Sequence, residues 1–104
     1  MAAGAASGVS TSAETKSKSQ AAKGRNVYTA NCARCHGGDG MGKTMMGEMT
    51  LAPNLSVATW QSQRSTSRMV ASVANGRGQM PAFKKKLSKG DIAAAVAYVR
   101  SLKR

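Results

Sequence analysis

The chain has 104 residues, a length typical of one domain. It contains only one Phe, one Trp and two Tyr, so few large side chains are present to fill a core. A domain of this size is marginally stable even with an ordinary aromatic content, because it buries a small share of its surface. The composition therefore indicates that a large apolar cofactor fills the centre of the fold.

The formal net charge is +12, from 16 Lys and Arg against 4 Asp and Glu. Such a surface attracts acidic proteins, anionic membranes or nucleic acid. Nucleic acid is disfavoured, because the run Lys84-Lys85-Lys86 has no interleaved aromatic residues to stack on bases. From Gly76 to Arg104 there are eight basic residues and one acidic residue. This basic third is either a docking face for acidic partners or a solvated surface.

Residues 1–19 are mainly Ala, Ser, Thr and Gly. Nothing there offsets the entropy of ordering, so we expect a flexible tail or linker, followed by one folded domain over residues 20–104. No segment is long and apolar enough to span a membrane, and residues 1–22 lack the apolar segment of a secretory leader. We therefore expect this chain to be a mature form or an engineered expression form.

The first predicted helix covers residues 22–31. Val27 and Tyr28 lie on its short apolar stripe, and Gly24 lies one turn before Tyr28. A glycine inside a helix costs about 1 kcal/mol relative to alanine, so Gly24 indicates a close contact with another helix. Several glycines over residues 37–47 then predict a loop-rich stretch.

The second predicted helix covers residues 65–75. Ser65 or Thr66 can cap its start, and Gly76 occupies the position usual for a C-terminal glycine. Met69 shares an apolar face with two valines, which is the pattern of a helix that packs on a core.

The third predicted helix follows a capping box that begins at Ser88, with Asp91 in the place usually held by Glu. Ile92, Val96 and Val99 then recur at helical spacing. No alternating strand pattern and no internal repeat is visible. The sequence therefore predicts an all-α fold.

The segment Cys32-Ala33-Arg34-Cys35-His36 reads C-x-x-C-H, the attachment signature of c-type haem. Two thiols three residues apart on a helical turn can both reach the vinyl groups along one porphyrin edge. The following imidazole can then bind the iron. The motif predicts one covalently attached haem c, with thioethers at Cys32 and Cys35 and His36 as an iron ligand.

Three other interpretations of the motif are open. A thioredoxin-type dithiol would follow a strand, and no strand is predicted before Cys32. A zinc site would need a fourth ligand, and the chain has no further Cys or His. A disulfide between Cys32 and Cys35 would close so short a loop that it would add little stability.

His36 is the only histidine, so a second iron ligand from this chain is a thioether or a Lys amine, unless the site is open. Met69 is better explained by core packing. Met80 lies in a segment whose glycines allow close approach to a flat ring and in which Pro81 lacks an N–H group, so we favour Met80. The seven methionines are Met1, Met41, Met45, Met46, Met49, Met69 and Met80.

Over about residues 20–104 the chain resembles the small monohaem cytochromes c with His/Met ligation. The matching features are Gly24, Tyr28, the Cys32–His36 motif, Ala52-Pro53-Asn54-Leu55, Met80-Pro81-Ala82-Phe83 and Tyr98. The resemblance implies the cytochrome c fold, with three main helices and loops around one haem. It also implies contacts of Gly24 and Tyr28 with the C-terminal helix around Ala95 and Tyr98.

The same resemblance implies that the carbonyl oxygen of Pro53 accepts the proton of the His36 imidazole. It further places Trp60 near a haem propionate.

With His36 and Met80 both bound, the iron would have no vacant site. We therefore expect a non-enzymatic electron carrier that cycles between Fe(II) and Fe(III) and exchanges electrons with acidic redox proteins. Two alternatives are the cytochrome domain of a larger redox enzyme and, with a labile Met80, a ligand-binding or peroxidase-like protein. We expect a monomer, exported to the periplasm or an equivalent compartment, because haem c is normally assembled outside the cytoplasm.

Overall fold

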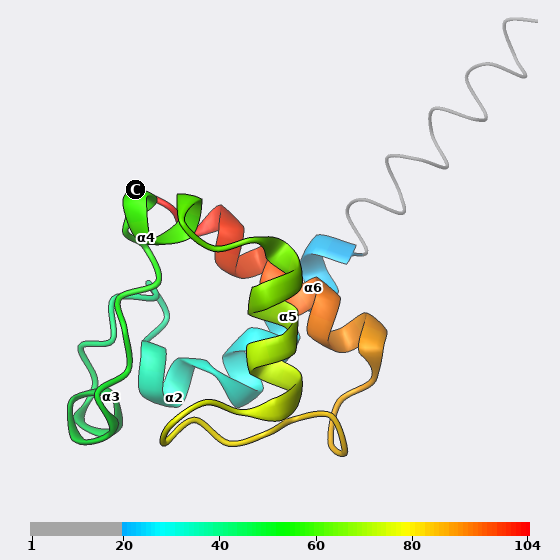
Figure 1. Ribbon diagram of the computed structural model, residues 1–104, viewed down its shortest axis with the longest axis horizontal. Helices are drawn as coiled ribbons and strands as arrows, with labels where there is room; N and C mark the ends of the chain where they lie inside the picture. The colour runs from blue at the N-terminus through cyan, green and yellow to red at the C-terminus, as the bar shows by residue number, and fades with distance from the viewer. Residues whose placement is uncertain (1–19) are drawn as a thin grey trace, which may run out of the picture.

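The computed structural model describes residues 20–104, so the expected tail over residues 1–19 lies outside the described residues. A helix covers residues 20–31. It is followed by α2 (Ala33–His36), α3 (Met45–Thr50), α4 (Ala58–Ser62), α5 (Thr66–Asn75) and α6 (Lys89–Ser101), as Figure 1 shows. Residues 20–104 contain no strand, only an isolated bridge between Arg77 and Met80. The predicted all-α fold is confirmed.

The three predicted helices are the longest in the described chain, and each lies close to its predicted position. The short helices α3 and α4 were not predicted, whereas α2 is the helical turn expected at the C-x-x-C-H motif. The predicted loop-rich stretch over residues 37–47 is wrong in part, because its last three residues, 45–47, begin helix α3. Thr44 starts α3 by accepting a hydrogen bond from the Gly47 N–H at 2.8 Å. None of the helices in the described part of the chain is both long and apolar enough to cross a membrane.

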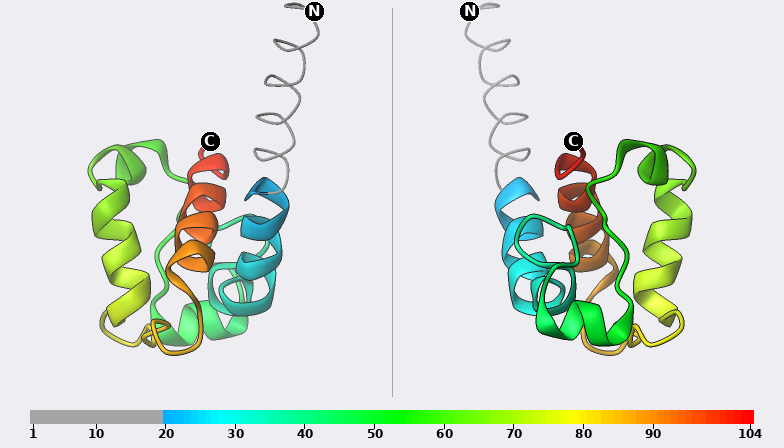
Figure 2. Two further views of the ribbon diagram at one scale, coloured as in Figure 1. Left: turned by 90° about the vertical axis from the view of Figure 1, so that its right-hand side faces the viewer. Right: turned by 90° about the vertical axis from the view of Figure 1, so that its left-hand side faces the viewer.

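Helix α6 lies between the helix over residues 20–31 and α5 (Figure 2). The first of these contacts depends on Gly24, where an added Cβ would overlap the Ala94 carbonyl oxygen. The rings of Tyr28 and Tyr98 pack with their centroids 5.2 Å apart. Gly24 thus has the helix–helix contact that its position predicted, with Ala94 rather than Ala95 as its nearest neighbour.

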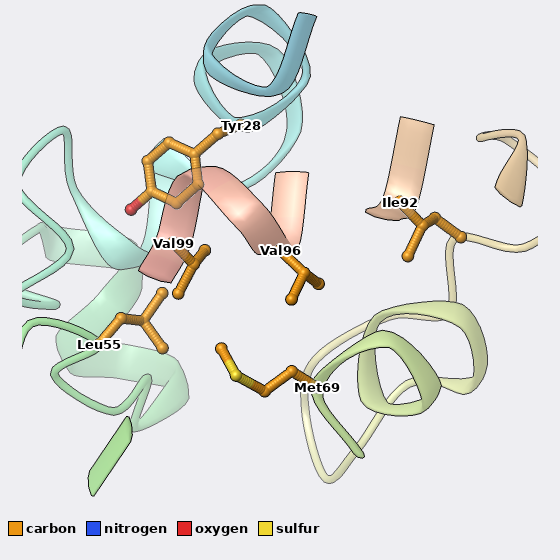
Figure 3. Close-up of a cluster of buried hydrophobic side chains, with 6 residues drawn as sticks. All are labelled: Tyr28, Leu55, Met69, Ile92, Val96 and Val99. Atoms are coloured by element: carbon orange, nitrogen blue, oxygen red, sulfur yellow. The ribbon is translucent and has the colours of Figure 1, made fainter. Parts of the chain in front are cut away.

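The main hydrophobic cluster is small, and Tyr28 is its one aromatic member, while Phe83 is buried outside it. Tyr28 and Val96 are almost completely buried, at 1% exposure each. Partly buried side chains, among them Trp60 and Leu102, pack around this core. The core consists of Tyr28, Leu55, Met69, Ile92, Val96 and Val99 (Figure 3).

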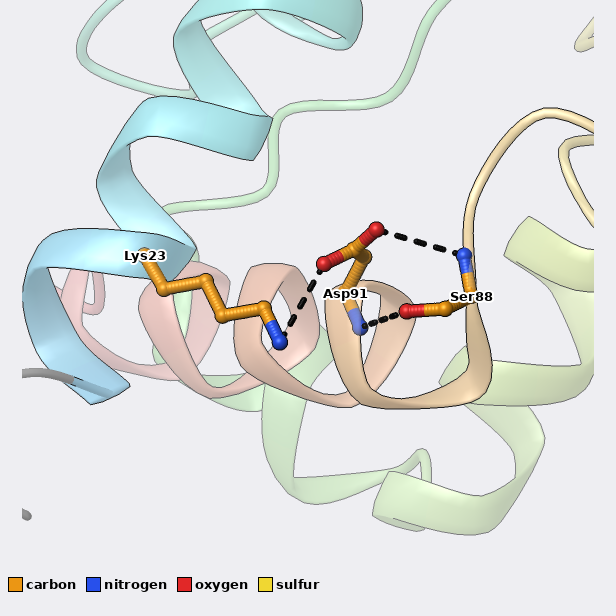
Figure 4. Close-up of polar contacts among 3 residues, drawn as sticks. All are labelled: Lys23, Ser88 and Asp91. Atoms are coloured by element: carbon orange, nitrogen blue, oxygen red, sulfur yellow. Dashed lines mark hydrogen bonds and ion pairs between the residues drawn. The ribbon is translucent and has the colours of Figure 1, made fainter.

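The predicted capping box at the start of α6 is confirmed (Figure 4). The Asp91 N–H donates to Ser88 Oγ at 3.1 Å, and the Ser88 N–H donates to Asp91 Oδ2 at 3.2 Å. Lys23 Nζ lies 3.2 Å from the other carboxylate oxygen of Asp91, so the cap also joins the first helix to α6.

A second polar junction, which sequence reasoning missed, joins α4 to α6. The buried Gln61 amide donates to the carbonyl oxygens of Leu55 at 2.7 Å and Val99 at 2.9 Å. The Arg100 guanidinium donates to the carbonyl oxygens of Gln61 at 2.6 Å and Arg64 at 2.5 Å. Arg100, one of the eight basic residues from Gly76 to Arg104, therefore also has a structural role that its charge alone did not indicate.

Candidate haem-binding site

The C-x-x-C-H turn continues the first helix. The Cys32 N–H donates to the Tyr28 carbonyl oxygen at 2.8 Å, and the His36 N–H donates to the Cys32 carbonyl oxygen at 3.0 Å. Both cysteines are half-buried and are not joined by a disulfide. Burial, with a smaller effect from Cys35, raises the pKa of the Cys32 thiol to about 11. Cys32 is therefore a neutral thiol near pH 7.

The His36 imidazole is 8% exposed, and its Nδ1 lies 3.2 Å from the Pro53 carbonyl oxygen. Because a carbonyl only accepts hydrogen bonds, this contact requires the proton on Nδ1 and leaves the lone pair on Nε2. Burial lowers the pKa of His36, against an opposing effect of the Pro53 bond, so the ring is neutral near pH 7. Among residues 20–104 no group forms a hydrogen bond with Nε2. A neutral ring with this tautomer fits an iron ligand.

The hydroxyl groups of Thr44 and Tyr28 donate hydrogen bonds to backbone carbonyls of the attachment turn and of Gly37. Thr44 Oγ1 lies 2.9 Å from the Cys35 carbonyl oxygen and donates there or to the Arg34 carbonyl. The Tyr28 hydroxyl donates to the Gly37 carbonyl oxygen at 2.6 Å, directly after the turn. The chain therefore fixes the backbone of the attachment turn through contacts of its own.

Met80 lies in a tight turn after α5. Arg77 and Met80 exchange two backbone hydrogen bonds, at 3.1 and 2.9 Å, and Gly76 opens the turn with a φ of 79°. The turn is tied back to α5 where the Phe83 N–H donates to the Val73 carbonyl oxygen at 3.0 Å. The Met80 side chain itself is half-buried. Its role as the second iron ligand stays a prediction.

The other methionines fall into two groups. Met69 is 7% exposed in the core, where packing was the expected explanation. Met45, Met46 and Met49 lie on the surface of α3, with exposures of 80%, 36% and 68%. Met41 is half-buried in the loop before α3, and Met1 lies outside the described residues.

Trp60 is half-buried in α4, and the Arg64 guanidinium lies over its ring, 4.3 Å from the ring centroid. Arg64 Nη1 also donates to the Trp60 carbonyl oxygen at 3.1 Å. The predicted position of Trp60 beside a propionate remains a prediction. Arg64 was missed in the sequence, although its i+4 spacing from Trp60 could have indicated a shared helix face.

Two observations bear on the other interpretations of the motif. In the structure the segment before Cys32 is a helix, whereas a thioredoxin-type dithiol follows a strand. Within residues 20–104 no group of three or more His, Cys, Asp and Glu side chains is placed to hold a metal ion.

Comparison with known proteins gives the family. The family described as "Cytochrome C oxidase, cbb3-type, subunit III" matches residues 19–99. The chain is 37% identical over 83 residues to the cbb3-type cytochrome c oxidase subunit CcoP of Azospirillum brasilense, covering 79% of this chain and 28% of that protein. It is 40% identical over 79 residues to cytochrome c6 of Leptolyngbya boryana, covering 76% of this chain and 88% of that protein.

A solved structure, the KustC0563 c-type cytochrome, superposes with a TM-score of 0.74 at 34% identity. The superposition covers 78% of this chain and 98% of that one. The resemblance noted in the sequence is thus confirmed by family, by relatives and by fold. The chain has the all-α cytochrome c fold, and its cofactor is covalently attached haem c. It belongs to the c-type cytochromes, within the family described as cbb3-type subunit III.

Proposed function

We propose that this chain transfers single electrons between redox proteins through one haem c, and that it is not an enzyme. The observation that carries the proposal is the state of His36. His36 follows the two attachment cysteines directly. Its ring is buried and neutral, and the Pro53 carbonyl oxygen accepts a hydrogen bond from its Nδ1. The bound haem supplies an iron that cycles between Fe(II) and Fe(III).

Five residues would attach the haem, bind its iron or orient an iron ligand. Cys32 and Cys35 would form the two thioether bonds, and His36 Nε2 would bind the iron on one face. Pro53 would keep that ring oriented, as outer partners of ligating histidines do. Met80 would close the opposite face with a thioether, which favours the ferrous state. Two protein ligands leave no iron position for a substrate, and this supports a carrier rather than a catalyst.

Trp60 and Arg64 would lie beside a haem propionate. The Arg64 guanidinium stacked on the Trp60 ring provides a fixed positive charge for a carboxylate, while its Nη1 is already held by the Trp60 carbonyl. The stacked pair supports the Trp60–propionate contact that the resemblance implied. The other implied contact, between Pro53 and His36, is supported by its own hydrogen bond.

The exposed Lys84, Lys85 and Lys86 would guide acidic redox partners to the molecule. These lysines lie soon after the Met80 turn in the sequence. The net charge of the whole chain, +12, is positive like theirs. We further propose that the protein works as a monomer in an exported compartment such as the periplasm. Such encounters are fast, short-lived and sensitive to salt.

A second version of the proposal has an intramolecular redox partner. The chain spans 28% of the CcoP relative but 88% of cytochrome c6. Both relatives fit electron transfer, and we propose as the alternative that this chain is the cytochrome domain of a larger redox enzyme, with residues 1–19 as its linker. The full-length gene product separates these two versions of the proposal.

The test is an absorption spectrum of the oxidised and reduced holoprotein with a potentiometric titration. We expect a low-spin spectrum in both states, a weak near-infrared sulfur-to-iron band in the ferric state, and a one-electron transition. A high-spin ferric spectrum with rapid peroxide turnover would contradict the carrier function and favour the peroxidase-like alternative.

A further inference from the structure

Helix α3 carries three methionines that the proposed haem site does not use. Met45, Met46 and Met49 are 80%, 36% and 68% exposed, so most of their surface has no packing partner. Exposed apolar positions on a soluble protein are usually few and scattered. Here three thioethers occur within five residues of one short helix. We call this group the methionine face.

The three side chains project from the same side of α3. Each helical residue advances by about 100°, so Met49 projects about 40° from Met45 and about 60° from Met46. All three therefore lie within an arc of about 100° around the axis of α3. Their spacings of i+3 and i+4 bring the Cβ atoms to about 5–6 Å, a span that flexible methionine side chains can close around one ion.

The structure also holds this face outward. Gly47, about 160° from Met49 around the helix, is buried, and an added Cβ there would overlap the Cys35 carbonyl oxygen. Thr44 caps α3 and bonds to the same carbonyl at 2.9 Å. Because the glycine side of α3 is fixed against the haem-attachment turn, the methionine face cannot turn inward to join the core.

We propose that the methionine face binds one Cu(I) ion through the sulfur atoms of Met45, Met46 and Met49. Thioethers are soft ligands that select Cu(I) over the hard cations preferred by carboxylates. Glu48 is the one carboxylate on α3, so the helix itself offers a hard cation a single charged oxygen ligand.

The site is separate from the proposed iron ligands, because α3 contributes neither His36 nor Met80. Binding needs no proton release, since a thioether is neutral, and it changes no oxidation state. An apolar docking patch would place the same side chains on the surface, and Leu51, 81% exposed after α3, would extend it. Substitution with leucine separates the two, because leucine keeps the apolar surface and removes the sulfur.

The experiment uses ferrous holoprotein, anaerobically and with excess ascorbate, so that both haem and copper stay reduced. Cu(I) is titrated against a chromophoric Cu(I) chelator, and the methionine methyl groups are followed by NMR after 13C labelling. We expect one Cu(I) per chain, with shifts at Met45, Met46 and Met49 and unchanged signals from Met69 and Met80. Zn(II) added in the same way should shift none of these signals.

The double variant Met45→Leu, Met49→Leu should lose affinity by about tenfold or more, while Met41→Leu, as a matched control outside α3, should bind like the parent. An unchanged visible spectrum and far-UV circular dichroism show that each variant is folded. Absence of binding, binding that the double variant retains, or a copper-induced shift of Met80 would each overturn the proposal. None of these outcomes depends on electron-transfer activity, so the site and the proposed function can fail separately.

Discussion

The two sides of the candidate haem site are built differently. On the histidine side, the side chain of His36 itself is held, by Pro53 at 3.2 Å, and Thr44 and Tyr28 bond to the backbone around it. On the methionine side, the hydrogen bonds that hold the turn over residues 77–80 are backbone bonds, and none involves the Met80 side chain. The Met80 side chain is half-buried without a polar partner of its own.

This difference indicates how each ligand is positioned. The hydrogen bond to Pro53 orients the imidazole independently of its bond to iron, so His36 should stay in place when the iron changes oxidation state. The thioether would be positioned mainly by its bond to iron, since the Met80 turn fixes only the main chain. The histidine side should therefore tolerate loss of the methionine ligand, whereas the reverse should not hold.

The largest effect is expected from Cys32→Ala or Cys35→Ala. Either change removes a covalent bond to the haem, and the small hydrophobic core cannot by itself offset the entropy of folding. We expect greatly reduced yields of holoprotein and a largely unfolded apoprotein. Haem content and NMR dispersion measure the two effects. A cooperative, well-dispersed apoprotein would show that the histidine side needs no cofactor at all.

Met80→Ala should leave the haem attached and the helices intact, because the histidine side is held independently. The near-infrared sulfur-to-iron band should disappear, the reduction potential should fall, and added imidazole or cyanide should bind readily. Met45→Leu and Met69→Leu serve as controls that should keep the band. If the band survived in Met80→Ala and vanished in another methionine variant, Met80 would not be the ligand.

The histidine side was also the part that the sequence predicted best. The C-x-x-C-H motif is contiguous, so its geometry follows from one helical turn, and the capping box at Ser88 is equally local. The junction of Gln61 and Arg100 was not predictable, because the two lie 39 residues apart and their partners are backbone carbonyls that any residue provides. Helix α3 was missed because glycines surround it, and its cap at Thr44 was the available signal.

Gly24→Ala tests the helix that leads into the histidine side. Alanine favours a helix over glycine by about 1 kcal/mol, but here its Cβ would overlap the Ala94 carbonyl oxygen. We expect a net loss of about 1–3 kcal/mol in the free energy of unfolding, as for other overpacked positions. Denaturant titration of the holoprotein measures it. Gly38→Ala is the control, since no heavy atom lies within 4 Å of its added Cβ.

Replacing Lys84, Lys85 and Lys86 with Gln tests the surface next to the methionine side. Electron exchange with an acidic redox protein should slow by roughly tenfold at low salt, because steering by surface charge is lost. The salt dependence should flatten, with little change in potential. The matched variant Arg34→Gln, Lys43→Gln alters exposed charges on the histidine side. Equal slowing in both variants would mean that net charge, rather than this surface, guides the partner.

The smallest effect is expected from Asp91, whose carboxylate closes the cap of α6 and pairs with Lys23. Hydrogen bonds from Ser88, then the Lys23 pair, hold the pKa of Asp91 below its ordinary value of 3.8. Because the folded pKa is the lower one, the stabilisation is fully present above the unfolded pKa and is lost as the pH falls through the folded pKa. The stability difference between the parent and Asp91→Asn should therefore be constant at neutral pH and shrink below about pH 4. Thermal unfolding at a series of pH values measures this stability difference.

Lys23→Met is the control variant. It removes the ion pair but keeps the Ser88 cap, so it should reproduce only the salt-sensitive part of the loss. A difference that grows as the pH falls would show that Asp91 is not stabilised in its charged form.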